Sequence, residues 1–121
     1  MKEVEITIDW RKFGELNDKM KDALVETMGE LQDRIREEQV IPRDTGALQG
    51  VKFFVDDSMR DAGIVMLVNE GPYARRLYYH PEYNFRQDKN KNAQGMWFSL
   101  WQRGGYYEKE PQEIFERIMK K

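Results

Sequence analysis

Residues 13–35, FGELNDKMKDALVETMGELQDRI, decide the fold because their apolar side chains recur at steps of three and four. Such spacing places these side chains along one face of a helix. The stripe consists of Phe13, Leu16, Met20, Leu24, Met28, Leu31 and Ile35. We predict that residues 10–39 form the longest helix, capped by Asp9 at its start and ended by Pro42.

The stripe has two interpretations, packing against a sheet and packing in a coiled coil. It extends over barely four heptads before Pro42 ends the helix, which is short for a coiled coil. We therefore favour packing against a sheet.

Three strands are predicted to form that sheet. Residues 4–8 alternate apolar and polar side chains, which is typical of a half-buried strand. Residues 51–56 and 63–69 resemble an antiparallel hairpin with a loop of about six residues. The apolar run 64–68 predicts a strand covered on both faces. The predicted class is α+β, with a long N-terminal helix packed on a small antiparallel sheet.

The C-terminal half adds short helices. Residues 73–79 fit either a helix or an edge strand. Apolar residues at helical spacing predict a short helix over 93–102, ended by the two glycines at 104–105. Pro111 suits the first turn of a last helix. We predict a single domain over residues 1–121.

The composition limits the chemistry that is available. The chain of 121 residues has a net charge of −2, no cysteine and one histidine. This excludes disulfide scaffolds, thiolate metal sites, thiol nucleophiles and mechanisms that need two histidines. No phosphate-loop, dinucleotide-binding or Gly-x-Ser-x-Gly pattern occurs. We expect no enzyme, no cofactor and, since no segment could span a bilayer, a soluble protein made in a cytoplasm.

Two features could suggest catalysis or metal binding. A metal at His80 would need ligands from Asp44, Asp56 or Asp57, whose spacing nothing fixes. We interpret His80 as a surface or structural histidine. The Asp-Thr-Gly tripeptide at 44–46 matches aspartic proteases, which need two such carboxylates in a mostly β scaffold. Here it follows a long helix, so we interpret it as a turn.

Charge is distributed unevenly along the chain. Residues 1–40 carry seven basic and eleven acidic side chains, whereas residues 71–103 carry six basic and two acidic ones. Opposite patches of this kind suit head-to-tail contact between copies. They also occur on small domains that have no such partner.

The basic segment is rich in aromatic residues as well. Its candidate interface residues are Arg75, Arg76, Tyr78, Tyr79, Arg86, Trp97 and Trp101. In one interpretation the aromatic rings pack on the sheet and the charges are solvated. In a second, the segment binds a protein, because Tyr, Trp and Arg are enriched at interface hot spots. In a third, the chain is a small nucleic-acid-binding protein that uses segment 73–103, with tyrosines stacked on bases.

Three stretches of the chain match the pattern of one known family. They read IPRDTGAL at 41–48, YARRLYYHPEYNF at 73–85 and NAQGMWF at 92–98. In this order they resemble the minor capsid and head–tail joining proteins of tailed bacteriophages and prophages. In that family a Thr-Gly-x-Leu turn leads from the helix into the sheet. Lys91 departs from the pattern, which has proline there.

The resemblance implies a structural virion protein without catalysis, part of a ring at the neck or the top of the tail. Its partners would be copies of itself and neighbouring head, connector or tail proteins. Contact with DNA would be weak and non-specific, and no membrane would be involved. Residues 73–85 with Trp97 would fix the basic segment against the sheet. The turn residues would be Asp44, Thr45, Gly46 and Leu48. The protein would be made in the bacterial host cytoplasm.

Overall fold

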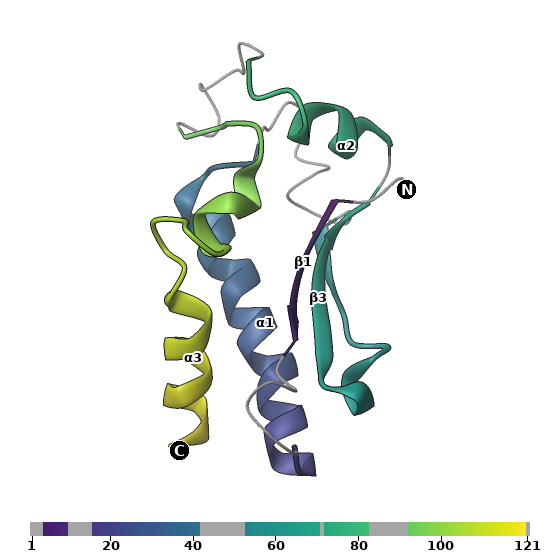
Figure 1. Ribbon diagram of the computed structural model, residues 1–121, viewed down its shortest axis with the longest axis vertical. Helices are drawn as coiled ribbons and strands as arrows, with labels where there is room; N and C mark the ends of the chain where they lie inside the picture. Colours follow the sequence, from purple (N-terminus) through teal and green to yellow (C-terminus); the bar gives the residue numbers. More distant parts are fainter. Residues whose placement is uncertain (1–3, 10–15, 42–52, 71, 83–91, 121) are drawn as a thin grey trace.

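The computed structural model describes residues 4–9, 16–41, 53–70, 72–82 and 92–120. In these residues a long helix, α1 (Asp18–Glu38), lies along a three-stranded antiparallel sheet (Figure 1). The last helix, α3 (Glu110–Met119), packs on α1 on the side away from the sheet. The predicted α+β class is confirmed.

The sheet is built around its third strand. Strands β1 (Val4–Asp9) and β2 (Phe53–Asp56) both pair antiparallel with β3 (Ile64–Asn69), which gives the order β1-β3-β2. The pairing of β2 with β3 confirms the predicted hairpin. Residues 51 and 52 of the predicted strand lie outside the described residues.

Helix α1 begins later than predicted, so the prediction of one helix over 10–39 is wrong at its start. Asn17 precedes the helix in an extended conformation, and Asp9, the predicted cap, is instead the last residue of β1. The Oδ1 atom of Asn17 accepts a hydrogen bond from the backbone N–H of Met20 at 2.9 Å. The helix begins there because this bond satisfies an amide that the first turn leaves without a helical partner.

The core lies between α1 and the sheet. Four residues of the predicted stripe are fully buried: Leu24, Met28, Leu31 and Ile35. The sheet contributes the buried residues Ile6, Phe53, Val65 and Leu67 to the same cluster. Leu16, which precedes α1, and Met20, in its first turn, are only partly covered, and Phe13 lies outside the described residues. The stripe therefore packs on the sheet as predicted.

The opposite face of the sheet is less completely covered. Val68 is 4% exposed, whereas Ile64 and Met66 on the same face are partly exposed. Phe54 of the neighbouring strand is 36% exposed. The prediction that the central strand is covered on both faces is therefore right at Val68 and only partly right towards Ile64.

The C-terminal elements are helical. Helix α2 (Pro72–Tyr78) decides between the two interpretations of segment 73–79. The helix predicted over 93–102 is a shorter 3₁₀ helix, η3 (Trp97–Trp101). Helix α3 has Pro111 in its first turn, as predicted.

Leu24→Ala or Leu31→Ala should lower the free energy of unfolding by about 2–5 kcal/mol, because truncating a fully buried leucine leaves a cavity. Lys19→Ala, at an exposed position of the same helix, should change it by less than about 0.5 kcal/mol. Urea denaturation followed by circular dichroism measures all three. Losses below about 1 kcal/mol for both leucine variants would contradict the assigned core.

Candidate functional site

Trp97 joins three parts of the chain. Its fully buried ring meets the ring of Tyr78, at the end of α2, edge to face with the centroids 4.8 Å apart. Its indole N–H donates a hydrogen bond of 2.8 Å to Oδ1 of Asn69, the last residue of β3. The neighbouring Met96 donates its backbone N–H to the carbonyl of Tyr78 at 2.8 Å. The start of η3 is thereby fixed to both α2 and the sheet.

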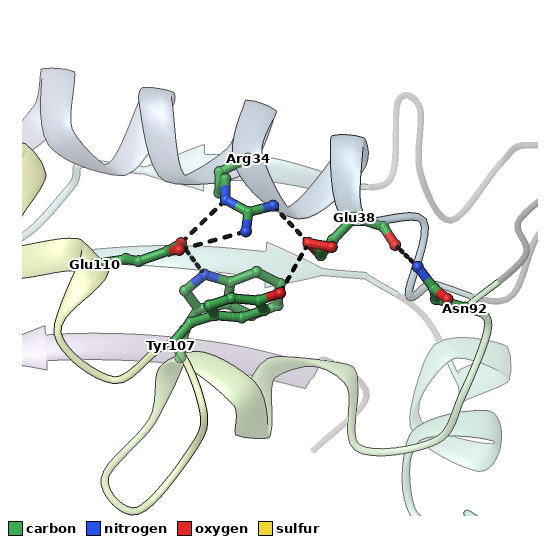
Figure 2. A network of polar contacts seen from close by, with 6 residues as sticks. Arg34, Glu38, Asn92, Tyr107 and Glu110 are labelled. Atoms are coloured by element: carbon green, nitrogen blue, oxygen red, sulfur yellow. Dashed lines mark hydrogen bonds and ion pairs between the residues drawn. The ribbon is translucent and has the colours of Figure 1, made fainter.

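The loop before η3 is also fixed to the end of α1. The backbone N–H of Asn92 donates to the carbonyl of Gln39 at 3.2 Å, and that of Gln94 donates to the carbonyl of Val40 at 2.9 Å. The side-chain amide of Asn92 donates to the carbonyl of Glu38 at 2.7 Å (Figure 2). Helix ends leave such carbonyls without helical partners. These three bonds fix the loop before η3 to the carboxyl end of α1.

A second cluster, which we call the arginine stack, holds α3 against α1 (Figure 2). The Arg34 guanidinium contacts the carboxylates of Glu38 at 2.7 Å and Glu110 at 3.2 Å. It also lies over the ring of Tyr107, 4.7 Å from the centroid. The Tyr107 ring stacks on Trp101 with centroids 5.3 Å apart. The indole N–H of Trp101 donates to Glu110 at 2.8 Å, which closes the cluster.

The arginine stack favours the charged form of Arg34. Burial alone lowers the pKa of Arg34, but hydrogen bonds with Glu38 and Tyr107 and the charge of Glu110 outweigh this effect and raise the pKa. A permanent cation is therefore held between two carboxylates and an aromatic face, an arrangement suited to fixing one helix on another.

An open groove, which we call the acidic groove, runs between α1 and α3 beside this stack. It has a volume of about 500 Å³ and is lined by the carboxylates Glu30, Asp33, Glu37, Glu110 and Glu113. Arg34, paired with Glu38 and Glu110, also lines it. The second arginine is Arg117, which pairs with Glu30. The groove therefore carries more negative than positive charge.

Helix α2 turns basic side chains to solvent, and we call this surface the basic face. It consists of Arg75 and Arg76, both exposed, and Tyr79, which is 57% exposed. The backbone N–H of Tyr79 donates to the carbonyl of Arg75 at 3.2 Å, which continues the helical turn. Tyr79 follows Arg76 by three residues and Arg75 by four, so each arginine neighbours the tyrosine on the helix surface.

The structure places three of the predicted interface residues in the core instead. The exposed fractions are 5% for Tyr78, 0% for Trp97 and 2% for Trp101. Their rings pack inside the protein, as one of the three interpretations of this segment required. The described candidates that reach solvent are therefore those of the basic face. The candidates that lie outside the described residues are Arg86 and the turn residues Asp44, Thr45, Gly46 and Leu48.

His80 contacts the carboxylate of Glu82. Its Nδ1 lies 2.8 Å from Oε2 of Glu82, and this hydrogen bond lowers the pKa of the Glu82 carboxyl. Asp56 instead accepts a hydrogen bond from the backbone N–H of Ser58 at 2.9 Å. Within the described ranges, no three His, Asp or Glu side chains are placed to hold a metal ion. Asp44 lies outside those ranges.

Comparison with known proteins gives no match. No protein-family model, no curated protein and no solved structure matches this chain. In the part of the chain that the structure describes, no helix is both long and apolar enough to cross a membrane.

Sequence analysis missed two features of the site. Arg34 and Glu38 have the spacing of a helical ion pair, but no local pattern places Tyr107 over the Arg34 guanidinium. Met96 adopts a left-handed φ of 48° and is 41% exposed. No sequence signal predicts this conformation, because residues other than glycine seldom adopt it.

Gly95→Ala should destabilise the protein, because a Cβ at position 95 would lie 2.6 Å from Cα of Pro81. The two segments must then separate, at a cost of about 1–3 kcal/mol. Gly29→Ala is the matched control, since a Cβ there meets no atom within 4 Å and alanine favours the helix by up to about 1 kcal/mol. Thermal unfolding measures both, and equal melting temperatures would contradict the close contact.

Tyr78 should make stability depend on alkaline pH. Burial raises the pKa of Tyr78 to about 12, against about 10 in the unfolded chain. Because the folded state holds this proton more tightly, the stabilisation is full below about pH 10 and is lost as the pH rises towards about 12. Across that range the free energy of unfolding should fall by about 1–3 kcal/mol more in the wild type than in Tyr78→Phe. Urea denaturation at several pH values between about 10 and 12 measures this difference. An equal fall in the free energy of unfolding for both proteins would contradict the burial of this hydroxyl.

Proposed function

We propose that this protein is a structural component of a tailed-bacteriophage or prophage particle, a minor capsid or head–tail connector protein in the neck or tail-top ring. The proposal rests on the resemblance of stretches 41–48, 73–85 and 92–98 to that family. The observation that carries it furthest is the packing of the second of these stretches on the third.

These two stretches form one structural unit. Tyr78 of the second meets Trp97 of the third edge to face, and the backbone N–H of Met96 donates to the Tyr78 carbonyl. Pro81 of the second lies so close to Gly95 of the third that a Cβ at position 95 would not fit. The second and third stretches, which match the family pattern in the same order along the chain, therefore also pack on each other. A shared structural motif requires such packing, whereas a chance similarity of sequence does not.

The competing function is a small nucleic-acid-binding protein that uses segment 73–103. That function needs exposed aromatic rings beside basic residues, so that bases can stack on them. Burial removes Tyr78, Trp97 and Trp101 from such a surface, and Tyr79 is the exposed ring of the basic face. This distribution favours the structural role, with copies of the chain and neighbouring head, connector or tail proteins as partners.

Deleting the gene from the phage or inducible prophage that carries it should abolish infectious particles and leave unjoined heads and tails. A plasmid copy should restore the yield. Antibody labelling of purified particles, viewed by electron microscopy, should place the protein between head and tail. A normal yield of infectious particles from the deletion strain would contradict the proposal.

Binding to DNA separates the two functions. Non-specific electrostatic binding typically has a Kd of about 10⁻⁴–10⁻⁶ M at physiological salt and weakens steeply as salt rises. As a structural protein, the chain should bind a short duplex or a single strand no more tightly than this at about 200 mM salt. Sub-micromolar or sequence-specific binding at that salt would favour the nucleic-acid-binding function.

A further inference from the structure

The exposed surface at the end of α2 has the composition of a protein contact. The basic face supplies Arg75, Arg76 and Tyr79. The exposed residue Met96 lies at the end of the same helix, because its backbone N–H bonds to the carbonyl of Tyr78. Tyr, Arg and Met are enriched at the centres of protein interfaces. Met96 is also held in a left-handed conformation, which is unfavourable for a residue with a side chain. The fold thus presents a large apolar side chain to solvent close to the end of the helix that carries the two exposed arginines.

The acidic groove offers the complementary charge. Of its carboxylates, Glu30 and Glu110 are paired with arginines that also line the groove. Glu37 of α1 and Glu113 of α3 form no ion pair with any residue that the structure describes. Ile114 of α3 also lines the groove and is only half-buried. The groove therefore combines excess negative charge with an apolar contact point.

The two surfaces lie on different sides of the molecule. In Figure 1, α3 and the adjoining side of α1 face away from the sheet, whereas α2 lies beyond one end of the strands, on the sheet side of α1. A single chain cannot bring the basic face into its own groove. The charges can meet only between two molecules.

We propose that the basic face, together with Met96, docks into the acidic groove of a second copy of this chain. The inference rests on the proposed role in a ring, and it specifies which surfaces meet. Arg76 and Arg75 would approach Glu37 and Glu113 of the next copy. Such a contact is heterologous, because each copy uses one surface on one side and a different surface on the other, and it repeats until a ring closes.

A second copy fits this surface better than DNA does. DNA phosphates would pair with the arginines alone. The acidic groove of a second copy would pair its carboxylates with the arginines, and its Ile114 would also offer an apolar contact to Met96 and Tyr79. The contact also accounts for excess charge of opposite sign on two faces of one small domain. Complementary potentials of this kind fix the orientation of a protein pair and suppress wrong partners.

A charge exchange tests the contact. One double variant carries Arg75→Glu with Arg76→Glu, and the other carries Glu37→Lys with Glu113→Lys. In sedimentation velocity the wild type should associate as its concentration rises, and less so at high salt. Each variant alone should associate at least about tenfold more weakly, because like charges then face each other. An equal mixture should regain association, since each variant then meets the opposite charge.

Lys19→Glu with Lys21→Glu is the control, because it changes net charge as much as the arginine variant does but lies at the start of α1. Circular dichroism should show that every variant is folded. A wild type that stays monomeric at every concentration, variants that associate as the wild type does, or a mixture that regains nothing would each overturn the contact.

The same variants separate this inference from the proposed function. If both double variants enter particles as the wild type does, the contact between copies is refuted while the virion role stands. If the mixture regains association but phage without the gene assemble normally, the contact stands and the virion role is refuted.

Discussion

The second half of the fold depends on the burial of Trp97. Its ring is fully enclosed, and edge-to-face pairs such as the one with Tyr78 contribute about 0.5–1.5 kcal/mol beyond the burial of their area. The indole N–H would cost free energy inside the core without an acceptor, and Asn69 supplies it. One side chain thus joins the end of β3, the end of α2 and the start of η3. The exposed positions of Arg75, Arg76 and Met96 follow from this constraint.

The two sides of α1 are held by different kinds of interaction. Towards the sheet, the contact is an apolar stripe from which water is excluded. Towards α3, it combines apolar residues such as Ile118 with the arginine stack. The Arg34 side chain is 28% exposed, so its ion pairs contribute less than buried ones would. The orientation of α3 on α1 is fixed by the stacking of Arg34 on Tyr107 and by the bond from Trp101 to Glu110. Arg34 and Glu110 also line the acidic groove.

The long helix, the hairpin and the last helix could be predicted from sequence, because each depends on local periodicity. The start of α1 could not be predicted, because Asp9 and Asn17 are both residue types that cap helices well. Asp9 belongs to β1, which pairs with β3, and Asn17 is therefore the residue that caps the helix. The burial of Tyr78 was also ambiguous, because a tyrosine suits a core and an interface equally well. The acidic groove needs residues of α1 and α3 side by side, which no local pattern specifies. The uneven charge along the chain nevertheless indicated the exposed arginines.

Amide hydrogen exchange in the native protein, measured residue by residue by NMR, tests most directly whether the loop before η3 is part of the core. Met96 and Gln94 donate their backbone N–H groups to the carbonyls of Tyr78 and Val40. We predict that these two amides exchange as slowly as those in the middle of α1, because they open only when the core opens. Fast exchange of both amides while the amides of α1 stay protected would contradict the claim that this loop is part of the core. It would also show that the contact between the loop and the end of α2 opens independently of the core.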